Sequence, residues 1–192
     1  MTVLPILTVG HPALRERAGE VTPEQLGHAD TQRFIDAMIE TMRDAGGAGL
    51  AATQVGDLRR IAVVEVVANH PRYPYKPPIP LTVIVNPQIE VLDRETFAVN
   101  EGCLSVPDLR GEVPRAVNIR VRSLDRHGER HEDVYRGLTA GTFQHEVDHL
   151  DGILFLDRVR DPATFTTWEQ FERYHRDAFV ARVNELQRRL AA

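Results

Sequence analysis

The sequence of 192 residues is long enough for one domain with a hydrophobic core. Hydrophobic residues make up 42% and charged residues 27%, a balance that is ordinary for a soluble globular protein. A formal net charge of −5 argues against DNA binding, which usually needs a basic surface. The single cysteine excludes a disulfide within the chain and fits a reducing compartment.

The N-terminal residues do not read as a targeting segment. Their apolar run is short, is interrupted by Pro5 and lacks a basic leader, so we expect no signal peptide. No stretch approaches the roughly 20 apolar residues that are needed to cross a bilayer. We therefore expect a cytoplasmic protein with no membrane partner.

A helix is predicted over residues 31–45. Apolar side chains recur there at the spacing of one helical face, at Phe34, Ile35, Met38, Ile39 and Met42. We expect Asp30 to cap its start and Gly46-Gly47 to end it.

The middle of the chain reads as β-structure. Residues 61–67 and 81–85 are rich in β-branched side chains, and the proline-rich stretch 69–80 between them predicts a long extended loop. Pro87 is expected to separate the second strand from a third over 89–92. Val117, Ile119 and Val121 alternate with polar residues, and the turn 125–128 then predicts a hairpin.

Two more helices are predicted in the last third of the chain. The first covers about 139–150, with Gly152 just past its end. Pro162 marks a break before a tail whose apolar residues, from Trp168 to Leu190, follow helical spacing. The fold class is therefore α+β, a single domain in which β-sheets wrap around a central helix and a C-terminal helix follows.

His145-Glu146-Val147-Asp148-His149 is a His-Glu-x-x-His element inside the predicted 139–150 helix. Residues four apart lie on one helical face, so both imidazoles can reach one metal, and Glu146 is close enough to take a proton from water. The alternative is a polar helix face with two ordinary histidines. The apolar residues Phe143, Leu150 and Ile153–Phe155 favour the metal, because buried histidines and acids need partners.

A third metal ligand is needed, and three positions compete for the role. One protease pattern requires a histidine at position 155, which is Phe155 here. Glu169 has a suitable spacing. Trp168 and Phe171 beside it suggest, however, that it lies on the solvent-exposed face of an amphipathic helix. Cys103 by itself is typical of a small buried hydrophobe, but beside a cation it would bind as a thiolate. Spacing alone leaves Glu169 and Cys103 open.

The chain resembles the peptide deformylases, which carry three short motifs in the order found here. Residues 47–54, Gly-Ala-Gly-Leu-Ala-Ala-Thr-Gln, are similar to the glycine-rich first motif. Residues 101–105, Glu-Gly-Cys-Leu-Ser, resemble the second motif, and His145–His149 resembles the third. The similarity spans about residues 3–158 and includes Gln144 and Leu150-Asp151-Gly152. It implies a catalytic domain over 1–160 and a C-terminal helix over 161–192 that packs on or extends from it.

The resemblance implies a metal-dependent hydrolase that removes the formyl group from N-formylmethionyl nascent peptides and releases formate. It assigns Cys103, His145 and His149 to the metal and proton transfer to Glu146. The metal implied in the cell is Fe²⁺, which Zn²⁺, Ni²⁺ or Co²⁺ can replace, because ligand chemistry alone does not choose among them.

The resemblance also implies roles for residues around the metal. The Gln54 side-chain amide and the Leu104 backbone N–H would donate to the oxyanion of the tetrahedral intermediate. Arg115 would pair with Asp148 to hold the metal-binding helix in place. The alternative for Gln54 is a surface residue that closes a loop, and the alternative for Arg115 is a solvated charge.

Substrate contacts follow from the same resemblance. Gly49, with Ala48 before it, would pair with the substrate backbone as an added β-strand does. Arg110 would lie beside the bound substrate, unless it is a solvated surface charge. Leu138 and Gly141 would wall the pocket for the methionine side chain. Since Gly141 stands where the family usually has a larger residue, we expect tolerance of first residues bulkier than methionine, unless the glycine only eases the start of the helix near a Thr139 cap.

Two rival functions remain to be compared. A zinc protease that uses Glu169 as third ligand leaves 47–54 and 101–105 without a role, and a metal-stabilised binding module leaves Glu146 without one. Some deformylases dock on the ribosome through a basic C-terminal helix, so the ribosome is a candidate partner. Arg182, Arg188 and Arg189 against Glu185 read more simply as a charged solvated face.

Overall fold

The computed structural model describes residues 2–191. One short helical turn and two helices come first: η1 (Pro12–Arg15), α1 (Pro23–Gly27) and α2 (Ala29–Asp44). A mostly β-sheet portion follows: β1 (Gly49–Ala51), η2 (Ala52–Val55), β2 (Ile61–Val66), β3 (Ile79–Val91), β4 (Thr96–Cys103), β5 (Val106–Ala116), β6 (Asn118–Leu124) and β7 (Arg130–Arg136). The chain ends with α3 (Gly137–Leu150), α4 (Phe155–Arg158), η3 (Pro162–Thr164), β8 (Thr166–Thr167), α5 (Trp168–Gln170), a π-helical turn η4 (Phe171–His175) and α6 (Arg176–Ala191).

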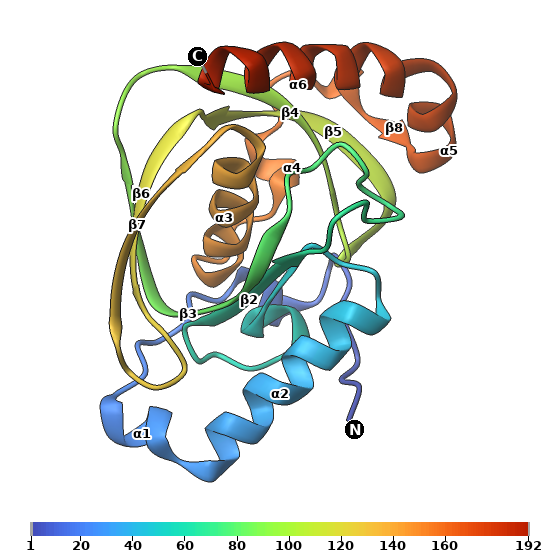
Figure 1. The fold of residues 1–192 in the computed structure, drawn as a ribbon. Coiled ribbons are helices and arrows are strands. Elements are labelled where there is room, and N and C mark those ends of the chain that lie inside the picture. The colour runs from blue at the N-terminus through green and yellow to red at the C-terminus, as the bar shows by residue number, and fades with distance from the viewer. Residues whose placement is uncertain (1, 192) are drawn as a thin grey trace.

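Two antiparallel sheets enclose the central helix α3, as Figure 1 shows. The larger sheet has the strand order β1-β2-β3-β6-β7, and the smaller has the order β4-β5-β8. The inner face of α3 packs on the larger sheet through Ala140, Phe143, Val147 and Leu150, which are buried in one cluster with β2 and β6 side chains. The expected α+β fold with sheets around a central helix is confirmed.

Helix α2 lies outside the larger sheet, below it in Figure 1. Its buried apolar residues Ile35, Met38, Ile39 and Met42 are four of the five that the periodicity predicts, and Phe34 is half-buried. The expected cap is wrong, because the helix begins at Ala29 behind His28, and Asp30 lies inside the first turn. Gly46, with φ +61°, takes the left-handed conformation just past the helix end, as glycine often does.

The predicted loop and break around β3 need correction. The strand begins at Ile79, which pairs with Val66, so the extended loop is shorter than 69–80. The strand also runs without a break through Pro87 to Val91. Proline lacks an N–H and interrupts a ladder, but its pairing with β6 shifts register between Val85 and Gln88, and this bulge accommodates Pro87.

Strands β4 and β5 form a hairpin that the sequence interpretation did not predict. The turn between them is tight, with Cys103 paired to Val106 across Leu104-Ser105. The residues of this hairpin include Gly102, Pro107, Gly111 and Pro114, which are poor strand formers and conceal it in the sequence.

The C-terminal segment packs across the outside of the β4–β5 hairpin, at the top of Figure 1. Phe171, Phe179 and Val183 are fully buried in a cluster with Val99 of β4 and Leu138 of α3. The predicted C-terminal helix is therefore present, with a π-helical turn at its beginning. Within residues 2–191, no helix is long and apolar enough to span a membrane.

Candidate active site

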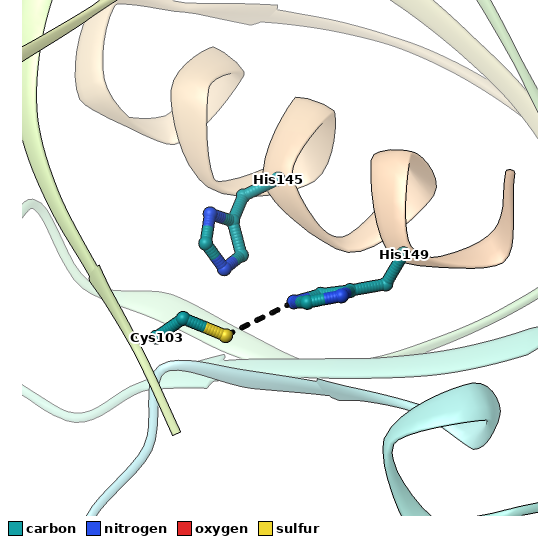
Figure 2. A group of neighbouring side chains, drawn as sticks. All are labelled: Cys103, His145 and His149. Atoms are coloured by element: carbon teal, nitrogen blue, oxygen red, sulfur yellow. Dashed lines mark hydrogen bonds between the residues drawn. The ribbon is translucent and has the colours of Figure 1, made fainter. Parts of the chain in front are cut away.

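Three potential metal ligands meet beside α3. The Cys103 Sγ and one ring nitrogen each of His145 and His149 all lie within 4.8 Å of one another. Figure 2 shows that both imidazoles project from the helix toward the thiol, and that Sγ lies 3.2 Å from His149 Nε2. Sulfur and nitrogen bound to one tetrahedral zinc ion would lie about 3.5 Å apart, which follows from the usual bond lengths. The donors therefore fit a single divalent cation.

The other candidate third ligand does not belong to this group. Glu169 lies on the short helix α5 and is exposed. Among the described residues, the one cluster of three or more potential ligands that could hold a metal is Cys103 with the two histidines. Tertiary structure thus separates the two positions that spacing left open.

Local structure fixes Cys103 at its position. It ends β4 immediately before the hairpin turn, and the Ser105 backbone N–H lies 3.4 Å from Sγ. Gln54 Nε2 also approaches Sγ, at 3.5 Å, and donates to Ser105 Oγ at 3.1 Å. These donors face the sulfur, and the thiolate is the form of cysteine that binds a metal.

The two histidines differ in their surroundings. Burial favours a neutral His145 ring, but hydrogen bonds with Cys103 and Glu101 raise the pKa of His145 well above its usual value. His145 Nδ1 lies 2.8 Å from Glu101 Oε2, an arrangement that commonly orients a metal-binding imidazole. Burial and the nearby His145 lower the pKa of His149 well below its usual value, so His149 is neutral. Among residues 2–191, His149 Nδ1 has no hydrogen-bond partner.

A buried ion-pair network supports the metal-binding face of α3. Arg115 donates from Nε and Nη2 to both oxygens of Glu101, at 2.6 and 2.9 Å, and from Nη1 to Asp148. Although burial opposes its ionisation, the Arg115 guanidinium holds the pKa of Glu101 well below its usual range. The structure therefore brings Arg115 and Asp148 together, as the resemblance implies, and adds Glu101 as the link to His145.

Glu146 projects into the same site. Its side chain is buried, and Oε2 has no hydrogen-bond partner in the described part of the chain. Burial raises the pKa of the Glu146 carboxyl group to about 7, against an ordinary value near 4.5. Gly49 faces this carboxylate so closely that a Cβ at position 49 would overlap it. The glycine is thus required by close approach, and the carboxylate is held against β1.

The residues of the first motif shape one wall of the site. Gln54 is buried rather than on the surface, and its Oε1 accepts from the Ala51 backbone N–H at 2.8 Å. This bond orients the amide so that Nε2 points toward Cys103. Gly47, Ala48 and Gly49 line the adjoining pocket with Leu104.

Arg110 is buried beside the pocket and is not a surface charge. Its guanidinium packs against the Trp168 and Phe171 rings, 4.2 and 4.3 Å from their centroids. Its Nε donates to Asn100 Oδ1 at 2.7 Å, while Nη1 has no hydrogen-bond partner within residues 2–191. These buried Nη1 N–H groups thus lack an acceptor in the described part of the chain.

The pocket that adjoins the metal-binding group has about 630 Å³ of empty space, part of it open to solvent. Leu138 and Gly141 of α3 line it, as the resemblance implies. Position 141 faces other residues, however: a Cβ there would meet Val99 Cγ2 at 3.4 Å and Arg115 Cγ at 3.8 Å. The helix begins at Gly137 behind Arg136, so Thr139 is not its cap.

The pocket lining includes residues that were not predicted as part of the site, among them Tyr73, Tyr75, Lys76 and Phe179. The first three come from the proline-rich loop and the last from α6. Nothing local in the sequence ties either segment to the metal-binding motif. The one available signal is the density of aromatic residues among the prolines of 71–78, which is unusual for a solvated loop.

The fold and the site together define a single-domain α+β protein with a buried Cys-His-His group able to hold a metal ion. The family model for polypeptide deformylase matches residues 3–164. A peptide deformylase of Alkalilimnicola ehrlichii is 46% identical over 162 residues, which cover 84% of each chain. That of Leptospira biflexa is 39% identical over 165 residues, covering 86% of this chain and 92% of the relative.

A solved structure agrees with these relatives. The class I type b peptide deformylase of Acinetobacter baumannii with bound Met-Ala-Ser superposes with a TM-score of 0.79 at 42% identity, covering 82% of this chain and 99% of the other. The chain therefore belongs to the peptide deformylase family, hydrolases that remove the formyl group from N-formylmethionine peptides.

Proposed function

We propose that Cys103, His145 and His149 bind the catalytic metal of this deformylase. The observation that carries the proposal is the convergence of one thiol and two imidazoles within 4.8 Å. When bound, the metal would supply Lewis acidity toward the formyl oxygen and toward water. The Glu101 carboxylate orients His145 through its Nδ1, and Arg115 fixes Glu101 in turn.

Glu146 is the proposed general acid and base. Its carboxylate is buried beside the metal-binding residues and has an oxygen without a protein partner, so it can accept a proton from the attacking water. The same group then delivers the proton to the departing amine. Atoms balance as one water and one formamide give formate and a free amino group.

Gln54 and the Leu104 backbone N–H are the proposed donors to the oxyanion that develops on the formyl carbon. Gln54 is preoriented by the bond from Ala51 N–H to its Oε1, which leaves Nε2 as the donor on the Cys103 side. Leu104 follows Cys103 in the hairpin turn, so its N–H lies beside the site. One such donor is typically worth about 3 kcal/mol of transition-state stabilisation.

We assign the peptide itself to the groove beside β1. Gly49, with Ala48 before it, presents the backbone with which an extended peptide would pair. Arg110 is preordered by its two aromatic neighbours and has an unpartnered Nη1 for the substrate. Leu138 and Gly141 line the pocket for the side chain of the first residue of the peptide. Tolerance of bulkier first residues follows only if the space near Gly141 and Val99 is open to the substrate.

The proposed setting is that of nascent N-formylmethionyl chains in the cytoplasm, with Fe²⁺ as the metal in the cell and Zn²⁺, Ni²⁺ or Co²⁺ as replacements. Residues 1–160 are assigned to the catalytic domain and 161–192 to a C-terminal helix of the same domain. The basic residues of α6 give limited support to ribosome docking, because Arg182, Arg188 and Arg189 pair with Glu112, Glu185 and Glu95.

The test is formate release from formyl-Met-Ala-Ser by protein prepared without oxygen, with bound metal measured on the same samples. We expect about one metal ion per chain, loss of metal and activity in Cys103→Ala, and retention of both in Glu169→Gln. The opposite pattern would make Glu169 the third ligand and overturn the assignment. Because Glu169 is an exposed acid outside the site, its variant is the matched control.

A further inference from the structure

Lys76 is the only lysine of the sequence, and arginine supplies the other 22 of its 23 basic residues. It lies in the loop between β2 and β3, where its side chain lines the pocket beside the metal-binding group. Lysine differs from arginine in presenting a compact ammonium that can donate in three directions. The one position at which this chain uses lysine is therefore a wall of the candidate active site.

The Lys76 ammonium is placed close to the reacting end of the pocket. Nζ donates to Thr142 Oγ1 at 3.1 Å and lies 4.9 Å from the centroid of the Tyr73 ring. Thr142 precedes His145 by three residues on α3, so it lies on the same face about 4.5 Å along the helix axis. The ammonium is bound to Thr142, which lies about one helical turn from the proposed metal ligand His145.

Two of the three Lys76 N–H bonds remain available. The Thr142 hydroxyl donates to the Leu138 carbonyl at 3.1 Å, so its oxygen is the acceptor for Lys76. Within residues 2–191, Nζ makes no other hydrogen bond. The Glu101 carboxylate, whose oxygens accept from Arg115 and His145, is not hydrogen-bonded to Lys76.

The pocket lining mixes apolar and polar side chains. Val99, Leu138 and Phe179 line it with Thr142 and Lys76. The second cation of the lining is Arg110, whose guanidinium packs against Trp168 and Phe171 and donates to Asn100. A thioether is a weak acceptor and leaves a cationic donor unsatisfied. A sulfoxide or amide oxygen would accept a charge-assisted hydrogen bond. A carboxylate fits less well, because the unpartnered Glu146 carboxylate lines the same pocket.

We propose that Lys76 is a specificity-determining residue that lets the pocket accept first residues with a neutral oxygen acceptor at the end of the side chain. N-formyl peptides that begin with methionine sulfoxide or glutamine are the substrate class. The inference rests on the proposed function, because it takes the first side chain of the peptide to enter this pocket. A merely structural role, in which the bond to Thr142 anchors the loop, predicts no change in selectivity.

Steady-state kinetics of the metal-loaded enzyme separate these possibilities. The substrates are the formyl derivatives of Met(O)-Ala-Ser, Gln-Ala-Ser, Glu-Ala-Ser and norleucyl-Ala-Ser, of which norleucine lacks an acceptor. The selectivity to be measured is kcat/KM for the methionine-sulfoxide peptide divided by kcat/KM for the norleucine peptide. In Lys76→Met, whose side chain is of similar length, this ratio should fall about ten-fold or more, the usual effect of losing one charged hydrogen bond. In Thr142→Val the ammonium remains, and the ratio should be retained.

Equal losses on all peptides in both variants would assign Lys76 to anchoring the loop and overturn the proposal. A wild-type enzyme that prefers the glutamate peptide over the sulfoxide and glutamine peptides would overturn the neutral-acceptor class. Wild-type enzyme that releases formate from none of these peptides, nor from formyl-Met-Ala-Ser, would instead overturn the proposed function. The two failures are thus distinguishable.

A binding measurement tests Lys76 without turnover. Because the chain has one lysine, [¹³Cε]lysine incorporation gives a single ε-methylene resonance in the zinc-loaded protein. Titration with the product Met(O)-Ala-Ser should shift this resonance more than titration with norleucyl-Ala-Ser. Equal shifts at saturation would contradict a direct hydrogen bond from Lys76 to the ligand oxygen.

Discussion

At the residue scale, Glu146 combines three properties that a group for proton transfer needs. It is buried, one of its oxygens lacks a protein partner, and burial raises its pKa to about 7. Position 49 beside it has no room for a side chain, so Gly49 places no side chain over the Glu146 carboxylate. These properties follow from the packing of α3 against β1 and are not features of an isolated motif.

We expect Glu146→Gln to keep the metal, because glutamine preserves the size of the side chain and the ligands are elsewhere. Deformylation should fall by about 10²–10⁴-fold, the usual cost of losing a general acid–base group. Turnover of formyl-Met-Ala-Ser and metal content on the same preparation provide the measurement. Near-normal turnover with full metal would show that another group moves the proton.

At the scale of elements, Arg115 joins two strands to the metal-binding helix. It lies on β5, pairs with Glu101 on β4 and reaches Asp148 on α3. All three side chains are buried, and such pairs are costly to break because a charge is left without its partner. The register of the β4–β5 hairpin, with Phe97 opposite Arg115, fixes this arrangement.

We predict that Arg115→Met lowers the free energy of unfolding by about 3–5 kcal/mol, because two buried carboxylates lose the guanidinium they share and keep only His145 at Glu101 and Arg158 at Asp148. Urea denaturation of the metal-free protein measures this loss without a contribution from the metal. Arg122→Met is the matched control, because Arg122 pairs with Glu90 and Glu132 on the surface. Similar losses in the two variants would mean that the buried network adds nothing beyond a surface pair.

The end of α3 depends on a glycine. Gly152 has φ +74°, and a Cβ there would lie 2.5 Å from the Arg15 carbonyl oxygen, so the chain cannot accept a side chain without moving backbone. Gly10 shares the positive φ, at +104°, but has open space around it. The comparison separates backbone strain from steric overlap.

We expect Gly10→Ala to cost about 1–2 kcal/mol through backbone strain alone. Gly152→Ala should cost about 1–3 kcal/mol more, because overlap with Arg15 forces a backbone shift beside His149. Thermal or urea unfolding of the two variants measures the difference. Equal losses would show that α3 can adjust its end freely.

At the scale of the whole molecule, segments far apart in the sequence meet around one side chain. Trp168 contacts Arg110 of β5, stands edge-on to Tyr73 of the β2–β3 loop and has Arg72 over its ring. The π-helical turn that follows buries Phe171, whose ring also lies against the Arg110 guanidinium. The C-terminal segment therefore holds the loop that carries Lys76.

We predict that Trp168→Ala destabilises the protein by about 2 kcal/mol, the value of one desolvated cation–π contact. Amide hydrogen exchange in residues 70–76 should also become faster, because the loop loses its contact with α5. Tyr174→Ala is the control, since that ring is 62% exposed. Unchanged exchange in the loop would show that Trp168 does not hold it.

The sequence by itself determined the helices α2 and α3, the β6–β7 hairpin and the residues of the metal-binding motif. Helical periodicity, alternation and the four-residue spacing of two histidines are short-range features, and local geometry fixes their meaning. The resemblance assigned the role of third ligand to Cys103, because spacing alone left both Cys103 and Glu169 open.

Tertiary structure decided what depends on contacts between distant segments. It brought Cys103 to His149 across 46 positions, turned Arg110 from a candidate surface charge into a buried one, and joined the proline-rich loop to the pocket. It also carried β3 through Pro87, because a bulge against β6 absorbed the missing N–H. Propensity describes each residue with its neighbours along the chain, whereas burial and pairing are set by the sheets that close around α3.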